Sequence, residues 1–233
     1  MAEAGHVDVA DERAAAARAL WPEAVIFDMD GLMIDSERVS VACWSEAAIA
    51  LGVPLPEGFF LRMVGLGDAD CLALLRAQVG DAGLISNLQA CSHALYEQRT
   101  QAGLPLRPGI IELLELLRAR GIPRAVATST RQPRAGRKLA ACGLIGYFET
   151  VVTSSDVRLP KPAPDIYLLA AERLGIAPPR CLALEDSPTG TRAALAAGMA
   201  VIQVPDLIIP DDAQRALGHR IVDSLHDVRA LLA

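Results

Sequence analysis

A short apolar run that ends in two aspartates constrains this chain more than any other feature. Residues 24–27 read Ala-Val-Ile-Phe, and Asp28 and Asp30 follow at once, with Gly31 behind them. An apolar run of this length, bounded by a glycine, is typical of a buried strand in a parallel sheet. Ligands of open α/β sheets bind at the carboxyl ends of such strands. The sequence therefore predicts a ligand site at the end of its first strand.

Further short apolar runs follow residue 104 and alternate with helical patterns. The expected strands are 24–27, 125–127, 149–153, 181–184, 200–204 and 221–222. Strands that alternate with helices predict a parallel sheet with helices on both faces. The predicted fold class is α/β, with a Rossmann-like, doubly wound parallel sheet as its core.

Residues 37–103 follow a different pattern. They are rich in Ala, Leu, Arg and Glu, and their apolar residues recur at helical spacing. This pattern predicts a small helical insert of three to five helices after the first strand. Phe59, Phe60 and Met63 are expected to form part of its apolar core.

The remaining residues divide into two further parts. Residues 22–36 and 104–233 are expected to form the α/β core domain. Residues 1–21 are expected to be an N-terminal extension, a disordered tail followed by a short helix. Residues 64–68 contain two glycines, but no strand precedes them. They are therefore interpreted as a turn between helices and not as a phosphate-binding loop.

Composition excludes several classes of protein. The formal net charge of −6 disfavours a nucleic-acid binder, which would carry a basic face. No apolar run approaches the length that spans a membrane. The five cysteines are scattered and form no CxxC, which favours a reducing compartment over a disulfide framework or a zinc site. We expect a cytoplasmic monomer that binds neither nucleic acid nor a membrane.

Polar residues follow four of the predicted strands, and in a parallel sheet these four positions share one edge. They are Asp28 with Asp30, Thr128, Lys161, and Glu185 with Asp186. Clustered carboxylates suit Mg²⁺, which in proteins is often bound by carboxylates together with the phosphate of a substrate. A lysine and a hydroxyl can hold phosphate oxygens. One carboxylate can then attack phosphorus while a second moves protons.

A basic helix is expected after the second of these positions. It carries Arg131, Arg134, Arg137 and Lys138. A run of positive charges on one helix is usually solvated, and we interpret this helix as a solvent-exposed face.

Four motifs, taken together, resemble those of the haloacid dehalogenase superfamily. The similarity is to the branch that contains β-phosphoglucomutase and the small sugar-phosphate phosphatases, and it covers nearly all of the chain after Pro22. The motifs are residues 27–31 (Phe-Asp-Met-Asp-Gly), 127–129 (Ala-Thr-Ser), 161–165 (Lys-Pro-Ala-Pro-Asp) and 184–190 (Leu-Glu-Asp-Ser-Pro-Thr-Gly).

The resemblance implies catalytic roles for both aspartates of the first motif. Asp28 would be the nucleophile, and Asp30 would be the general acid and base. Thr128, Ser129 and Lys161 would bind the substrate phosphate. The implied activity is Mg²⁺-dependent hydrolysis of small phosphomonoesters, sugar phosphates foremost, through an aspartyl-phosphate intermediate.

The resemblance also implies a metal site and a moving part. Mg²⁺ would be held by Asp28, by the backbone carbonyl of Asp30 and by Asp186, with Glu185 beside it. The helical insert would act as a mobile cap that excludes water and selects the substrate, a small phosphorylated metabolite.

Three alternatives stay open. A hexose-phosphate mutase of the β-phosphoglucomutase type would carry a His and an Arg where this chain has Ser40 and Asp68, which favours the phosphatase. A receiver-like signalling protein would carry its phosphorylated aspartate on the third strand and lack a large insert. A phosphate-binding relative without activity would lack Asp28 or Asp30, and both are present.

Overall fold

The computed structural model describes residues 21–64 and 68–233. Within these residues, one six-stranded sheet has the order β3-β2-β1-β4-β5-β6, and every neighbouring pair of strands is parallel. The strands are β1 (Ala24–Phe27), β2 (Arg124–Thr128), β3 (Thr150–Thr153), β4 (Cys181–Glu185), β5 (Ala200–Gln203) and β6 (Arg220–Ile221). The predicted α/β, doubly wound fold is confirmed. The expected extension, except for Trp21, and positions 65–67 of the expected turn lie outside the described residues.

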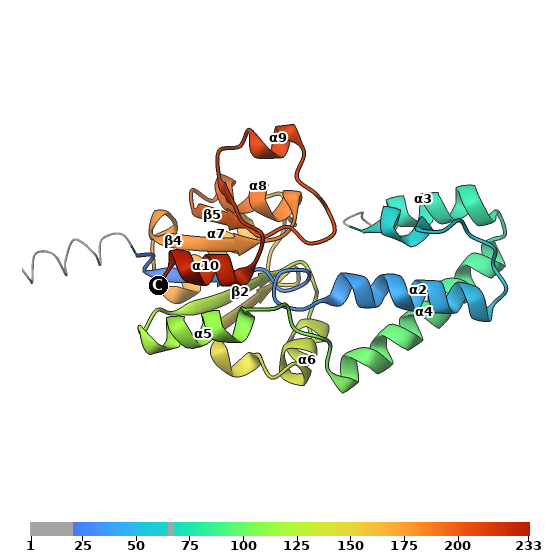
Figure 1. Cartoon of the computed structure of the whole chain (residues 1–233), viewed down its shortest axis with the longest axis horizontal. Helices are drawn as coiled ribbons and strands as arrows, with labels where there is room; N and C mark the ends of the chain where they lie inside the picture. The colour runs from blue at the N-terminus through green and yellow to red at the C-terminus, as the bar shows by residue number, and fades with distance from the viewer. Residues whose placement is uncertain (1–20, 65–67) are drawn as a thin grey trace, which may run out of the picture.

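Helices cover both faces of this sheet because its strands are apolar on both sides. In β1, Val25 and Phe27 belong to one apolar cluster, whereas Ala24 and Ile26 belong to another, as the twofold repeat of a strand requires. Figure 1 shows α5 and α10 side by side against the sheet. The first cluster includes residues of α5 (Ile110–Ala119), α6 (Arg134–Ala141) and α10 (Leu225–Leu231), and the second includes residues of α7 (Asp165–Leu174) and α8 (Pro188–Ala196). The short helices η2 (Ile145–Tyr147), η3 (Pro178–Arg180) and α9 (Asp212–Arg215) lie in the connections.

A helical insert separates β1 from α5. It consists of α2 (Ser36–Ala50), η1 (Phe59–Met63), α3 (Asp68–Val79) and α4 (Ala82–Ala102). In Figure 1, α2 and α4 run side by side and extend away from the sheet. The insert has an apolar cluster of its own, and Phe59, Phe60 and Met63 belong to it, as predicted.

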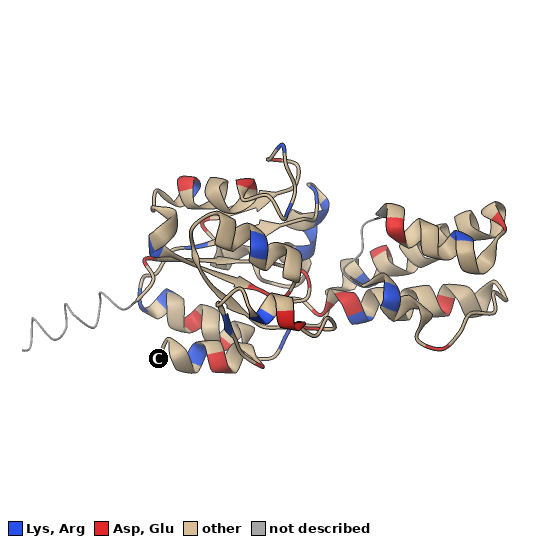
Figure 2. Cartoon of the chain, turned by 90° about the horizontal axis from the view of Figure 1, so that it is seen from above, with Lys and Arg blue, Asp and Glu red and all other residues tan. Residues whose placement is uncertain are grey.

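Charged residues are spread over both halves of the described chain. Figure 2 shows Lys and Arg interspersed with Asp and Glu on the core and on the insert, and no continuous basic face is visible in that view of the described residues. None of the helices within residues 21–64 and 68–233 combines the length and the apolar character needed to cross a membrane.

Two linkers join the insert to the core, and one buried carboxylate bonds at both ends of the insert. Ile34 of the first linker and Leu106 of the second form an antiparallel bridge. Asp206, which follows β5, has a side chain only 1% exposed. Its Oδ1 accepts from Arg38 at the start of α2 at 2.5 Å and from Arg107 of the second linker at 2.8 Å. A single core residue thus holds both ends of the insert.

We expect Asp206→Ala to destabilise the protein by about 2 kcal/mol, because it removes a charged hydrogen-bonding partner from two arginines. Urea unfolding followed by circular dichroism measures the change. Glu57→Ala, at an exposed turn of the insert, is the control and should change the free energy of unfolding by less than about 0.5 kcal/mol. Equal losses in both variants would contradict the role of Asp206.

Candidate active site

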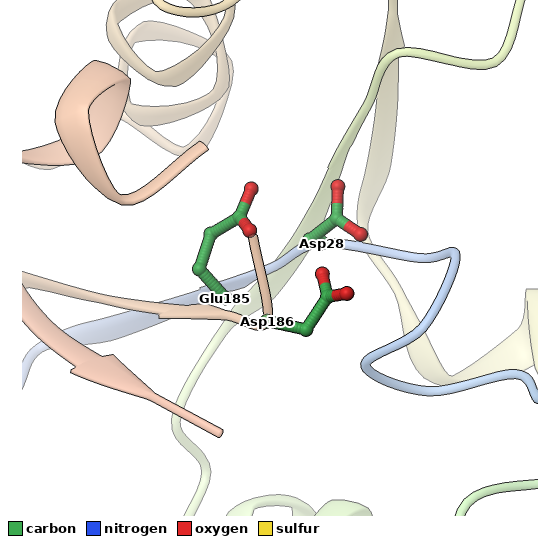
Figure 3. Close-up of side chains that lie close together, drawn as sticks. All are labelled: Asp28, Glu185 and Asp186. Carbon is green, nitrogen blue, oxygen red and sulfur yellow. The ribbon is translucent and has the colours of Figure 1, made fainter. Parts of the chain in front are cut away.

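Three carboxylates meet where the winding of the sheet reverses. Strand β1 lies between β2 and β4, so the chain leaves it in both directions, and a crevice forms at such a switch point. Asp28 follows β1, Glu185 ends β4, and Asp186 comes next. One oxygen from each of the three lies within 4.8 Å of the others. Figure 3 shows these side chains grouped at the strand ends.

Two glycines make this crowding sterically possible. Gly31 has a φ of 85°, and a Cβ built on it would lie 2.2 Å from Oδ2 of Asp186. A Cβ at Gly190, in the first turn of α8, would lie 1.5 Å from Oε1 of Glu185. Any other residue would displace the carboxylates, so both glycines of the sequence motifs are required by close approach.

Lys161 joins two of the three carboxylates. Its Nζ donates to Oδ1 of Asp28 and to Oε1 of Glu185, each at 2.6 Å. Glu185 is completely buried and also accepts from the Tyr167 hydroxyl at 3.0 Å and from the Ser187 backbone N–H at 2.9 Å. Both oxygens of Glu185 are therefore bonded within the protein, whereas Asp28 and Asp186 line the cavity described below.

Burial and crowding act on the acidity of the cluster. Burial raises the pKa of Asp28 to about 8, although the Lys161 ammonium lowers it. Burial, with Glu185 and Asp28 adding to it, also raises the pKa of Asp186 well above its ordinary value. Burial by itself lowers the pKa of Lys161, but the two carboxylates raise it well above normal overall. A divalent cation among hard carboxylate oxygens would stabilise both aspartates as anions, so the donor set fits Mg²⁺.

The Asp30 side chain lies outside this cluster. Its Oδ1 accepts from Lys138 Nζ at 2.5 Å, and its Oδ2 accepts from the Thr130 hydroxyl at 2.7 Å. Burial would raise the pKa of Asp30, but the charge and hydrogen bond of Lys138 lower it overall. Among the metal ligands expected from the sequence, Asp30 can therefore contribute through its backbone carbonyl while its carboxylate bonds elsewhere.

The predicted solvent-exposed basic helix is wrong for one of its four members. Lys138 is only 3% exposed, since it shares the inner face of α6 with the buried Ala135 and Leu139. Lys138 and Leu139 lie three and four residues after Ala135, so the helical spacing of the sequence could have placed Lys138 on the buried face. Arg134 and Arg137 are exposed, as expected, and Arg131 precedes the helix.

A cavity of about 940 Å³ lies between the core and the insert. Six of the seven predicted site residues line this cavity: Asp28, Asp30, Thr128, Ser129, Lys161 and Asp186. The seventh, Glu185, lies behind them and does not line it. The insert contributes polar side chains from α2 and α4, which the sequence did not single out as a set. They include Ser40, Gln89, His93 and Tyr96.

The fold and site belong to a recognisable class of proteins. The family model for haloacid dehalogenase-like hydrolases matches residues 22–198. The chain therefore belongs to the haloacid dehalogenase-like hydrolases, and the resemblance seen in its motifs is confirmed.

Similar proteins indicate which activities within this family the chain resembles. The chain is 33% identical to the phosphorylated carbohydrates phosphatase of Thermotoga maritima, over 90% of each chain. It is 35% identical to hexitol phosphatase A of Escherichia coli, over 77% of this chain and 81% of that one. A crystal structure described as a putative β-phosphoglucomutase from Thermotoga maritima superposes with a TM-score of 0.78 at 31% identity, covering 90% of this chain and 97% of that chain. The family and the curated relatives identify the chain as a phosphatase, as predicted.

Proposed function

We propose that this chain is a Mg²⁺-dependent phosphatase of phosphorylated carbohydrates that works through a phosphorylated Asp28. The observation that carries the proposal is the meeting of Asp28, Asp186 and Lys161 at the switch point of the sheet. Two curated relatives act, by their names, on phosphorylated carbohydrates and on hexitol phosphates. The size of the cavity suits a substrate of this kind, and its polar wall offers partners for hydroxyl groups.

The proposed reaction assigns each residue one task. Asp28 attacks phosphorus and forms the phosphoenzyme while the bond to the leaving oxygen breaks, and Asp30 gives that oxygen a proton. Water then attacks the phosphoenzyme, Asp30 removes its proton, and the bond between Asp28 and phosphorus breaks. Thr128, Ser129 and Lys161 bind the phosphate oxygens.

Asp28, Asp186 and the backbone carbonyl of Asp30 would hold Mg²⁺, with Glu185 supporting Lys161 beside them. When bound, the cation offsets charge on the phosphoryl oxygens and favours the ionised form of Asp28. The insert, residues 37–103, acts as the cap that closes over the cavity and excludes water. The cytoplasmic location and the monomeric state stay predictions.

A mutase is the second candidate, because a solved structure described as a putative β-phosphoglucomutase is similar over nearly the whole chain. Ser40 lines the cavity at the position where the sequence comparison expects a mutase to carry histidine. A serine cannot supply the imidazole of a histidine, which favours hydrolysis.

We expect Mg²⁺ to be required for phosphate release from a panel of hexose, hexitol and nucleoside monophosphates. EDTA should lower the rate about 100-fold or more, since the cation contributes several kcal/mol to the transition state, and added Mg²⁺ should restore it. β-Glucose 1-phosphate belongs in the panel, with its conversion to glucose 6-phosphate followed in parallel. Metal-dependent isomerisation of glucose 1-phosphate with little release of free phosphate would show that the chain is a mutase and not a phosphatase. An EDTA-insensitive rate would overturn the metal dependence.

A further inference from the structure

Lysine is rare in this chain, and both of its lysines are buried at the candidate active site. Of the 22 Lys and Arg residues, only Lys138 and Lys161 are lysines. Lys161 bonds to Asp28 and Lys138 bonds to Asp30. Each aspartate of the pair therefore has an ammonium group of its own. Lys161 belongs to the family motif, whereas the role of Lys138 is open.

Lys138 and Thr130 hold the Asp30 carboxylate from two sides. They donate to different oxygens, at 2.5 Å and 2.7 Å, so the plane of the carboxylate is fixed as well as its position. A carboxylate accepts about four hydrogen bonds, so each oxygen still has room for another partner. The Asp30 side chain is 22% exposed and lines the cavity. It is therefore held at the wall that a substrate would touch.

Lys138 is itself held in place from the insert. Its Nζ donates to the Tyr96 hydroxyl of α4 at 2.9 Å and lies 5.3 Å from the centre of the same ring. The ammonium thus has its carboxylate and its phenol in fixed directions, and little side-chain freedom is left. A guanidinium is larger and planar, so it is not equivalent to the ammonium in this geometry.

We propose that Lys138 is a positioning residue that holds the Asp30 carboxyl group at the cavity wall for proton transfer. The inference rests on the proposed function, in which Asp30 protonates the leaving oxygen and later deprotonates water. Lys138 touches neither substrate nor phosphorus in this scheme. Its loss would remove the ammonium that fixes Oδ1 of Asp30 and leave the carboxylate freer to rotate, which slows the steps that need Asp30.

Substrates with different leaving groups test this role. An alkoxide leaving group needs a proton, whereas p-nitrophenolate leaves readily without one. We expect Lys138→Met to slow phosphorylation of Asp28 about 100-fold with the best sugar phosphate of the panel, the scale of general acid catalysis. The rate with p-nitrophenyl phosphate should fall less than about tenfold. Rapid acid quench of single turnovers measures both rates. Arg137→Met, an exposed cation on the same helix, is the matched control and should change neither.

A double mutant shows whether Lys138 acts through Asp30. In an Asp30→Asn background, Lys138→Met should add no further loss, because the group that it positions is already gone. Additive losses, or equal slowing of both substrates by Lys138→Met, would overturn the inference. If Lys138→Met does not fold, Lys138→Gln replaces it, since an amide still donates to Asp30, and it should show the same substrate selectivity with a smaller loss.

The failure of this inference differs from the failure of the proposed function. If the wild-type enzyme turns over but no phosphoryl group is trapped on Asp28 by acid quench, both the proposed function and the role of Lys138 are wrong. If Asp28 is phosphorylated but Lys138→Met slows the sugar phosphate and p-nitrophenyl phosphate equally, only the role of Lys138 is wrong.

Discussion

Asp28→Asn is expected to abolish turnover without weakening the fold. An amide cannot attack phosphorus, and loss of a nucleophile typically costs a factor on the order of 10⁴ or more in rate. Burial raises the pKa of Asp28 to about 8, so its ionised form is unfavourable in the metal-free protein near neutral pH. A neutral side chain relieves this, and the thermal midpoint in EDTA should therefore not fall.

Phosphate release and acid-quenched labelling measure the effect of Asp28→Asn. The variant should release no phosphate above background and carry no acyl-phosphate label. Asp223→Asn makes the same chemical change at an exposed position before α10 and should retain full activity. Turnover by Asp28→Asn within tenfold of the wild type would exclude Asp28 as the nucleophile.

Lys161→Met is expected to have the largest effect on stability. Lys161 is 5% exposed and is the cation that bonds to both Asp28 and Glu185. Its removal leaves the buried Glu185 carboxylate without its ammonium partner and Asp28 without a hydrogen-bond donor, and breaking a buried ion pair in this way costs about 3–5 kcal/mol. Weaker inhibition by free phosphate should accompany the loss, because Lys161 is also the proposed phosphate ligand.

Urea unfolding in EDTA measures this cost, and two comparisons identify its cause. Added Mg²⁺ should recover part of the stability, because a ligand that binds only the native state stabilises it. Glu185→Gln combined with Lys161→Met should cost less than the sum of the two single changes, because the Gln removes the charge that Lys161→Met leaves unpaired. A loss below about 1 kcal/mol for Lys161→Met, or strict additivity, would mean that this ion pair contributes little.

The contacts of Lys161 with Asp28 and Glu185 also show how much of the site could be predicted from the sequence. The motifs placed Asp28, Lys161, Glu185 and Asp186 on one sheet edge, because strand ends can be recognised from short apolar runs. They did not show that both oxygens of Glu185 are already bonded within the protein. Oε1 of Glu185 accepts from Lys161 and Tyr167, which are 24 and 18 residues away in the chain and reach Glu185 only in the folded structure.

The insert illustrates the same limit at larger scale. Its helices and its apolar core, with Phe59, Phe60 and Met63, followed from periodicity. Its attachment through Asp206 did not, because Asp206 is 168 residues from Arg38 in the chain. No local pattern connects residues at such a separation, whereas a hydrophobic repeat is local by nature.

The sequence by itself determined the parallel sheet, the inserted helices and the two aspartates at the end of the first strand. Each of these depends on patterns within about ten residues of chain. Only the tertiary structure decided which charges pair: Lys161 with Asp28 and Glu185, and Lys138 with Asp30 and Tyr96. The reason is physical, because a charge on a helix is solvated or buried according to what packs against it. For Lys138 that partner comes from α4, more than forty residues earlier in the chain.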